Sequence, residues 1–309
     1  MSLRAWFELL RVPAILTVPG DALAGAASVG LRPDRGTFCA AAASVCLYEA
    51  GMALNDWADR AEDAVDRPHR PLPSGRVRPT SALLAAGALT AAGIALASRA
   101  GRPAAVTAGA LAATVWAYDL GLKRTAWGPA AMGAARGLDV VLGAAATGRG
   151  VRSPTARTAA VVAAHTLAVT AISRHETTGG SSRTPLAALV LAGAIAAVTA
   201  RPPAARETTT ALFGPPPTAR GTTATSFVNP LHGAAATAAL YTATAARPYL
   251  HAALHPSPHL TQQAVSGGIR ALIPLQAALT ARSGRPLTAA ALLTLTPVAR
   301  RLFRKVSAT

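Results

Sequence analysis

Hydrophobic residues arrive along this chain in long blocks, each bounded by Arg, Pro or Gly. The blocks are about 17–22 residues long, which is the length that a helix needs to cross a ~30 Å hydrocarbon layer. The pattern predicts an all-α, polytopic membrane bundle of about nine transmembrane helices around a central cavity. The blocks lie at about 12–30, 37–56, 80–99, 103–121, 127–147, 155–174 and 185–200, with further ones near 228–247, 262–281 and 286–303.

Two stretches depart from this pattern. Residues 1–11 place Trp6 and Phe7 beside Arg4 and Arg11, which is typical of a helix lying in the membrane interface. Residues 201–227 are rich in Thr and Pro and indicate a loop. We expect one transmembrane domain over residues 1–309, and one of the last three helical blocks is expected to be short or interfacial.

The net charge of +17 would suit a nucleic-acid-binding protein only if the basic residues formed one surface. They instead sit singly or in pairs in the gaps between apolar blocks, so nucleic acid is excluded as a partner and the lipid bilayer is expected. Cys39 and Cys46 stand too far apart on one helix to form a disulfide.

Acidic residues gather where the second block ends. In the segment that begins Asn55-Asp56-Trp57-Ala58-Asp59, continuous helix would bring Asp56 and Asp63 to nearly the same azimuth, with Asp59 about 60° away. Hard oxygen ligands at this spacing suit Mg²⁺, which takes one or two carboxylates and completes its shell with water and phosphate oxygens. The alternative is a solvated loop with local ion pairs.

Basic residues follow the acids within a stretch that prolines stiffen. Arg67 and Arg70 are placed to hold phosphate oxygens. Residues 55–79 therefore form an Asp-rich loop predicted to bind a magnesium–diphosphate group. Lys and Arg are spread almost evenly between the two membrane faces, so they give no orientation. We expect the Asp-rich loop, with its dense arginines, to face the cytoplasm at the plasma membrane.

The string NDWADRAEDAVDRPHRPLPSG, which begins at Asn55, closely resembles the first Asp-rich motif of the UbiA superfamily of intramembrane prenyltransferases. That motif reads NDxxDxxxD and continues R-P-x-R-P-L-x-S-G. The string YDLGLKRTAWGPAAMGAARGLD at 118–139 resembles the Tyr–Lys segment of the same family. The order of the helical blocks agrees with the family along most of the chain.

The resemblance implies nine helices around a cavity, two magnesium ions, and an isoprenyl diphosphate whose tail lies among the helices. By the same resemblance, Asn55, Asp56, Asp59 and Asp63 bind metal. Arg67, Arg70, Lys123 and Arg124 hold the diphosphate. The catalytic set is Asp56, Asp59, Asp63, Lys123 and Tyr118.

The second half departs from the family pattern, which has another Asp-rich motif after the sixth helix. The matching loop, residues 171–184, offers Glu176 as its one acid, so Glu176 is the candidate ligand of a second metal. Arg174 is expected to supply positive charge to the diphosphate. Alternatively, His175 and Glu176 cap or pair at a helix end. The form of this loop resembles the UbiA-like branch of Ebo-type gene clusters.

Other acids lie inside apolar blocks. Glu49 precedes Asp56 on the same face, where it either contacts an acceptor or is a neutral acid between helices. Asp21 is similar. For Asp139 we favour a structural pairing with Arg136, one turn away.

These residues predict a Mg²⁺-dependent transferase that moves an isoprenyl group from its diphosphate to an aromatic or other electron-rich acceptor. The apolar cavity would protect the allylic cation from water, and Tyr118 would stabilise that cation or only anchor its helix at the interface. The alternatives are a terpene cyclase with the same site, and a non-catalytic isoprenoid-binding or transport protein.

Overall fold

Helices in this chain start at prolines and at polar capping residues. In the computed structural model, which describes residues 3–176, 181–201 and 230–306, α3 (Arg35–Ala58) begins after Asp34. The Asp34 side chain accepts a hydrogen bond from the Thr37 amide at 2.8 Å. α5 (Pro79–Ser98) has proline in its first turn, where a missing N–H leaves no bond unmade. Each start is followed by an apolar run, and the helix continues through it.

The remaining helices follow the same logic. They are α1 (Leu3–Leu9), η1 (Val12–Thr17), α2 (Pro19–Ser28), α4 (Arg60–Asp66), α6 (Arg102–Leu120), η2 (Leu122–Arg124), α7 (Gly128–Ala145), α8 (Ser153–Ser173), α9 (Arg183–Ala200), α10 (Pro230–Leu254), α11 (Pro258–Arg282) and α12 (Pro286–Val306). The predicted all-α class is confirmed.

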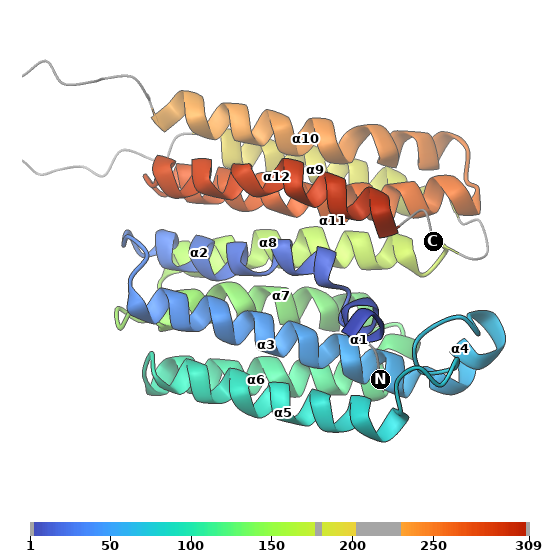
Figure 1. The fold of residues 1–309 in the computed structure, drawn as a ribbon. Helices are drawn as coiled ribbons and strands as arrows, with labels where there is room; N and C mark the ends of the chain where they lie inside the picture. The colour runs from blue at the N-terminus through green and yellow to red at the C-terminus, as the bar shows by residue number, and fades with distance from the viewer. Residues whose placement is uncertain (1–2, 177–180, 202–229, 307–309) are drawn as a thin grey trace, which may run out of the picture.

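The long helices lie side by side in a bundle (Figure 1). α3 packs against α5 and α6, α7 against α2, α6 and α8, and α11 against α8, α10 and α12. α3, α6 and α8 run in the same direction, so their C-terminal ends, with the segments that follow them, lie at one end of the bundle, from which α4 projects (Figure 1). We call this end the polar end.

Five helices in the described part of the chain are long and apolar enough to cross a membrane, namely α3, α5, α8, α9 and α11. The number of spans, predicted as about nine, stays a prediction. The loop predicted for 201–227 lies outside the described residues beyond Arg201. α1 occupies the stretch predicted to be an interfacial helix, and its position at the interface also stays a prediction.

Two expected elements differ from the structure. The block at 12–30 is divided into η1 and α2, because Pro19 has no N–H to continue a helix and instead occupies the first turn of α2. The Asp-rich stretch is helical over much of its first half: α3 runs to Ala58 and α4 starts at Arg60. The break at Asp59 means that the three aspartates do not share one continuous helical face.

One buried polar cluster joins the helices of the second half. The Nδ1 atom of His165 lies 3.1 Å from the Tyr241 hydroxyl, and its Nε2 atom lies 3.0 Å from the Gly268 carbonyl oxygen. A carbonyl only accepts, so Nε2 donates and Nδ1 accepts from the hydroxyl. His165 is thus fully bonded between α8, α10 and α11, which is a structural role.

α2 and α7 approach each other closely because both carry glycine at the crossing. A Cβ atom on Gly143 would collide with the backbone of Ala22, and one on Gly25 would collide with the Val140 carbonyl. Small residues allow such contacts between membrane helices. This crossing fixes α7, which carries Arg136 and Asp139, against the helix that carries Asp21.

Replacing Gly143 with alanine should therefore destabilise the bundle by about 1–3 kcal/mol, the usual cost of overpacking. Thermal unfolding of the purified protein in detergent measures the effect. Gly109→Ala is the matched control, because nothing lies within 4 Å of a Cβ at Gly109. The control should be neutral or stabilising, since alanine favours helix; equal unfolding temperatures for the two variants would contradict the close crossing.

Candidate functional site

Three segments that are distant in the sequence meet at the polar end of the bundle. They are the end of α3 with α4 and the loop after it, the η2 turn between α6 and α7, and the residues after α8 (Figure 1). Contacts join all three: Arg124 in η2 lies 3.2 Å from Asp59, and Arg174 donates to the Thr125 carbonyl. The predicted site residues are therefore assembled by the fold.

Asp56 and Asp63 converge on one guanidinium group. The Nη1 atom of Arg70 lies 2.7 Å from Asp63 Oδ2 and 3.6 Å from Asp56 Oδ1. Both carboxylates are buried, and Arg67 makes a longer contact of 3.5 Å with Asp63. A single positive group is thus held between two carboxylates that lie on opposite sides of the helix break.

Asp59 turns to different partners. Its Oδ1 atom lies 2.7 Å from Lys123 Nζ and 3.2 Å from Arg124 Nη2, so it joins the Asp-rich segment to η2. The expectation of one shared face with Asp56 and Asp63 is wrong, because the helix ends at Asp59 and restarts at Arg60. The acids form two adjacent groups, each balanced by basic side chains.

The N-terminal segment also contributes to the site. Arg11 Nη2 donates to Asp56 Oδ1 at 3.0 Å. Among the described residues, Arg11 is the non-glycine residue with a left-handed backbone (φ 48°), a conformation that costs about 1 kcal/mol or more. Glu8 in α1 accepts two hydrogen bonds from Arg76, at 2.6 and 2.9 Å, and this pairing lowers the pKa of Glu8. The sequence had suggested Arg11 only as part of an interfacial helix.

Asp119 is a second residue that the sequence analysis missed. Its Oδ1 atom accepts a hydrogen bond of 3.0 Å from Asn55 Nδ2 and lies 4.0 Å from Lys123 Nζ. The carboxylate fixes the amide so that the Asn55 carbonyl oxygen is left free to bind a cation. An acid near the end of an apolar helix, four residues before Lys123, was the available signal.

The residues after α8 lie beside this group. Burial raises the pKa of Glu176, and the nearby Arg67 opposes the rise. Glu176 has Arg67 as its charged neighbour, and its role as a metal ligand stays a prediction. Arg174 is exposed and bonds to the Thr125 carbonyl, so its contact with a diphosphate also stays a prediction. Residues 177–180 of the predicted second loop lie outside the described residues.

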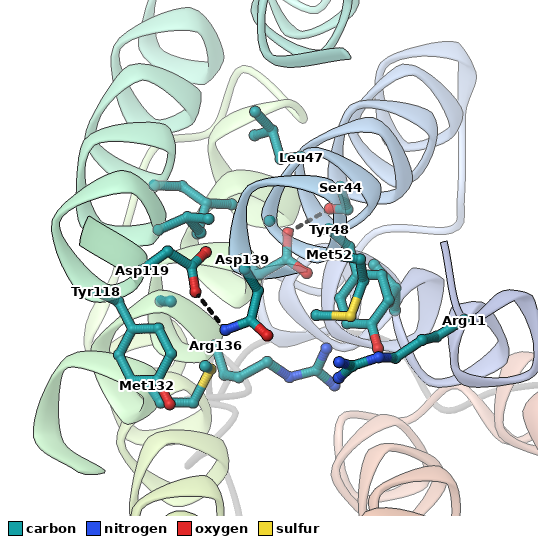
Figure 2. A pocket seen from close by; sticks show the side chains of 16 residues that line it. Arg11, Ser44, Leu47, Tyr48, Met52, Tyr118, Asp119, Met132, Arg136 and Asp139 are labelled. Carbon is teal, nitrogen blue, oxygen red and sulfur yellow. Dashed lines mark hydrogen bonds between the residues drawn. The ribbon is translucent and has the colours of Figure 1, made fainter. Parts of the chain in front are cut away.

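A cavity of about 290 Å³ opens between α3, α6 and α7 next to these charges. Asn55, Asp119 and Tyr118 line one part of it, together with Arg11. Apolar side chains, including Leu47, Met52, Leu111, Val115 and Met132, line much of the rest. Figure 2 shows Tyr118 and Asp119 on one side of this pocket and Tyr48 and Met52 on the other.

Acids deeper in the bundle differ from expectation. The favoured pairing of Asp139 with Arg136 is wrong: Ser44 donates to Asp139, and Arg136 Nε lies 2.9 Å from Asp21 Oδ2. Glu49 is buried and, within the described structure, neither of its oxygens has a hydrogen-bond partner. It is absent from the cavity lining, so it does not face an acceptor there.

The donor set fits a magnesium ion. No three acidic, His or Cys side chains in the described residues form a ready cage. Mg²⁺ needs only one or two carboxylates, because water and phosphate oxygens complete its shell. The place between Asp56 and Asp63 already holds one positive group, Arg70, which shows that it suits a cation.

The comparisons with known proteins agree with this architecture. The model of the UbiA prenyltransferase family matches residues 14–178, more than half of the chain. This chain belongs to the UbiA prenyltransferase family. The match covers the Asp-rich segment, the η2 turn, and the end of α8 with Glu176.

Relatives by sequence are named as synthases. The chain is 35% identical over 128 residues to a digeranylgeranylglyceryl phosphate synthase of Methanopyrus kandleri, over 40% of this chain and 45% of that protein. It is 39% identical over 99 residues to the bacteriochlorophyll synthase 33 kDa chain of Rhodobacter capsulatus, over 30% of this chain and 33% of the relative. The matched segment thus spans less than half the length of these relatives.

Solved structures share the fold of this UbiA-family chain. A UbiA homologue from Aeropyrum pernix K1 superposes with a TM-score of 0.60 at 17% identity, covering 86% of this chain and 96% of the other. A UbiA homologue from Archaeoglobus fulgidus bound to GPP and Mg²⁺ superposes with a TM-score of 0.54 at 18% identity, over 63% and 76%. The membrane-helix fold of the family therefore extends to the second half of this chain.

Breaking the Arg11–Asp56 ion pair should loosen α1 from the polar end. In Arg11→Gln, the amides of α1 are expected to exchange hydrogen about fivefold faster, equivalent to ~1 kcal/mol for a part-exposed charged contact. Exchange measured by mass spectrometry tests this expectation. Arg4→Gln is the control on the same helix, because Arg4 is exposed; similar exchange in both variants would show that the pair does not hold α1.

Proposed function

We propose that this protein is a Mg²⁺-dependent intramembrane prenyltransferase. It would move an isoprenyl group from an isoprenyl diphosphate to an electron-rich acceptor. The observation that carries the proposal is the meeting of Asp56, Asp59 and Asp63 with basic residues at one end of an apolar cavity. Family membership and the printed names of the synthases support it.

The diphosphate would lie where the basic side chains now pair with carboxylates. Arg67, Arg70, Lys123 and Arg124 are the candidates to bind its oxygens, with Arg174 from the end of α8. Asn55, Asp56, Asp59 and Asp63 are the candidates to hold magnesium, with Glu176 beside Arg67. When bound, Mg²⁺ supplies charge neutralisation of the leaving diphosphate.

The protein's own residues then favour ionisation of the allylic C–O bond. Lys123 and the arginines stabilise the negative charge that develops on the diphosphate. The apolar lining keeps water from the allylic cation, and the Tyr118 ring at the cavity wall can stabilise that cation through its face. No protein nucleophile is required.

We further propose that the polar end faces the cytoplasm at the plasma membrane. Isoprenyl diphosphates are highly charged, and a site at a membrane face admits such a head group while its tail enters the bundle. The family relation and the apolar helices support a membrane protein, whereas the dense arginines of the Asp-rich segment support this orientation.

Replacement of Asp59 tests transfer directly. Asp59→Asn removes the carboxylate that joins Lys123 and Arg124, and the rate of Mg²⁺-dependent diphosphate release is expected to fall at least about a hundredfold. The measurement is product formation from isotope-labelled isoprenyl diphosphate by purified protein. The control is Glu62→Gln, because Glu62 is an exposed acid on the adjacent helix α4.

The products also separate the other candidate functions. Diphosphate release with prenylation of an added acceptor supports transfer, whereas release with cyclised hydrocarbon and no acceptor product indicates a cyclase. Tight binding of diphosphate without release indicates a carrier. Full activity of Asp59→Asn would refute the proposed use of the Asp-rich segment.

A further inference from the structure

A second polar group lines the cavity away from the polar end. Ser44 and Asp139 both line it, and the Ser44 hydroxyl donates a hydrogen bond to Asp139 Oδ1. Ser44 precedes Asn55 by three turns of α3, which is about 16 Å along the helix. Figure 2 shows this hydrogen bond within the pocket and separates it from the Asp119 contact. The cavity therefore has two polar regions with apolar surface between them.

Asp139 differs from the other acids near the cavity because no basic partner is bonded to it in the described residues. Arg136, one turn earlier on α7, is committed to Asp21: its Nε lies 2.9 Å from Asp21 Oδ2, and Nη2 donates to the Thr17 carbonyl at 3.1 Å. The other oxygen of Asp21 accepts from Gln276 at 2.7 Å. The Asp21–Arg136 pair is thus complete without Asp139.

An acid without a cation in the interior of a membrane protein is costly to maintain. Asp139 is 4% exposed, and its one bonded neighbour is a neutral hydroxyl. Such a group can hydrogen-bond a ligand and accept or hold a proton. The family's metal-binding segment does not include it, and it lies on a different helix from every predicted metal ligand.

The charges of the cavity indicate the kind of ligand. The basic residues of the lining are Arg11 and Arg136, and both are already paired with buried carboxylates. An acceptor that carried its own carboxylate would place a second negative charge near Asp139 with no uncommitted cation to balance it. A neutral hydroxyl fits better, because it can donate to the Asp139 carboxylate.

We propose that Asp139, oriented by Ser44, binds the hydroxyl group of a neutral, long-chain alcohol acceptor and takes its proton during prenyl transfer. This inference rests on the proposed prenyl transfer. The allylic C–O bond breaks and its electron pair leaves with the diphosphate. The acceptor oxygen forms the new C–O bond with the allylic carbon, and its proton passes to the Asp139 carboxylate. The product is an ether.

The test uses purified full-length protein in lipid nanodiscs, with geranyl diphosphate and Mg²⁺ as donor. 1-O-Hexadecylglycerol serves as the neutral alcohol, and 4-hydroxybenzoate serves as the anionic aromatic acceptor. Wild type should form an ether with hexadecylglycerol in preference to prenylating 4-hydroxybenzoate. Asp139→Asn should lower the rate of ether formation at least about a hundredfold, as expected for loss of a general base, while the Kd of geranyl diphosphate stays within about twofold.

Controls separate chemistry from folding. Asp34→Asn makes the same change at a helix N-cap where asparagine serves equally well, and it should retain the wild-type rate. Ser44→Ala keeps the carboxylate and should lose about tenfold in rate, with recovery in Ser44→Thr, as expected for a positioning hydroxyl. Infrared difference spectra recorded on adding hexadecylglycerol without diphosphate should contain a carboxyl band that Asp139→Asn removes.

Each result decides one claim. Loss of geranyl diphosphate binding by wild type in Mg²⁺ would overturn prenyl transfer itself, and the role of Asp139 with it. Intact diphosphate binding together with a wild-type ether rate in Asp139→Asn would overturn the role of Asp139 alone. A preference of wild type for 4-hydroxybenzoate, or failure to bind hexadecylglycerol in protein that binds the diphosphate, would overturn the neutral-alcohol assignment.

Discussion

The structure depends on pairing buried carboxylates with basic side chains at one end of a membrane helix bundle. Taking a charge out of water is expensive unless an opposite charge and good hydrogen bonds compensate it. Asp56, Asp59 and Asp63 are compensated by residues from the N-terminal segment, the loop after α4, and η2. The charges therefore draw segments that are far apart in sequence onto one site, and no charged pair in that group is local to a single helix turn.

The same pairing explains how such a site could admit a magnesium–diphosphate. Arg70 bridges Asp56 and Asp63, and Lys123 with Arg124 holds Asp59. A ligand that brings its own cation and anion can exchange partners with these pairs: the carboxylates turn to the metal and the basic groups to the phosphates. The total charge of the site changes little in such an exchange, which limits its electrostatic cost.

Much of the fold and part of the site could be predicted from the sequence. The lengths of the apolar blocks gave the all-α membrane class, and the string from Asn55 to Gly75 gave the family. Helix periodicity failed at Asp59, because a break in the helix changes the azimuth of every later residue. Partners across the bundle were beyond reach: Arg136 pairs with Asp21, and Asn55 with Asp119, through the packing of helices that no local pattern encodes.

The central claim is that the polar end binds an isoprenyl diphosphate together with magnesium. The most direct measurement is the equilibrium affinity of wild-type protein for geranyl diphosphate as Mg²⁺ is titrated against a chelator. The affinity should rise with Mg²⁺ and fall at least about tenfold when the metal is removed, since carboxylates and phosphates repel without a cation between them. Equal affinity with and without Mg²⁺ would contradict the claim.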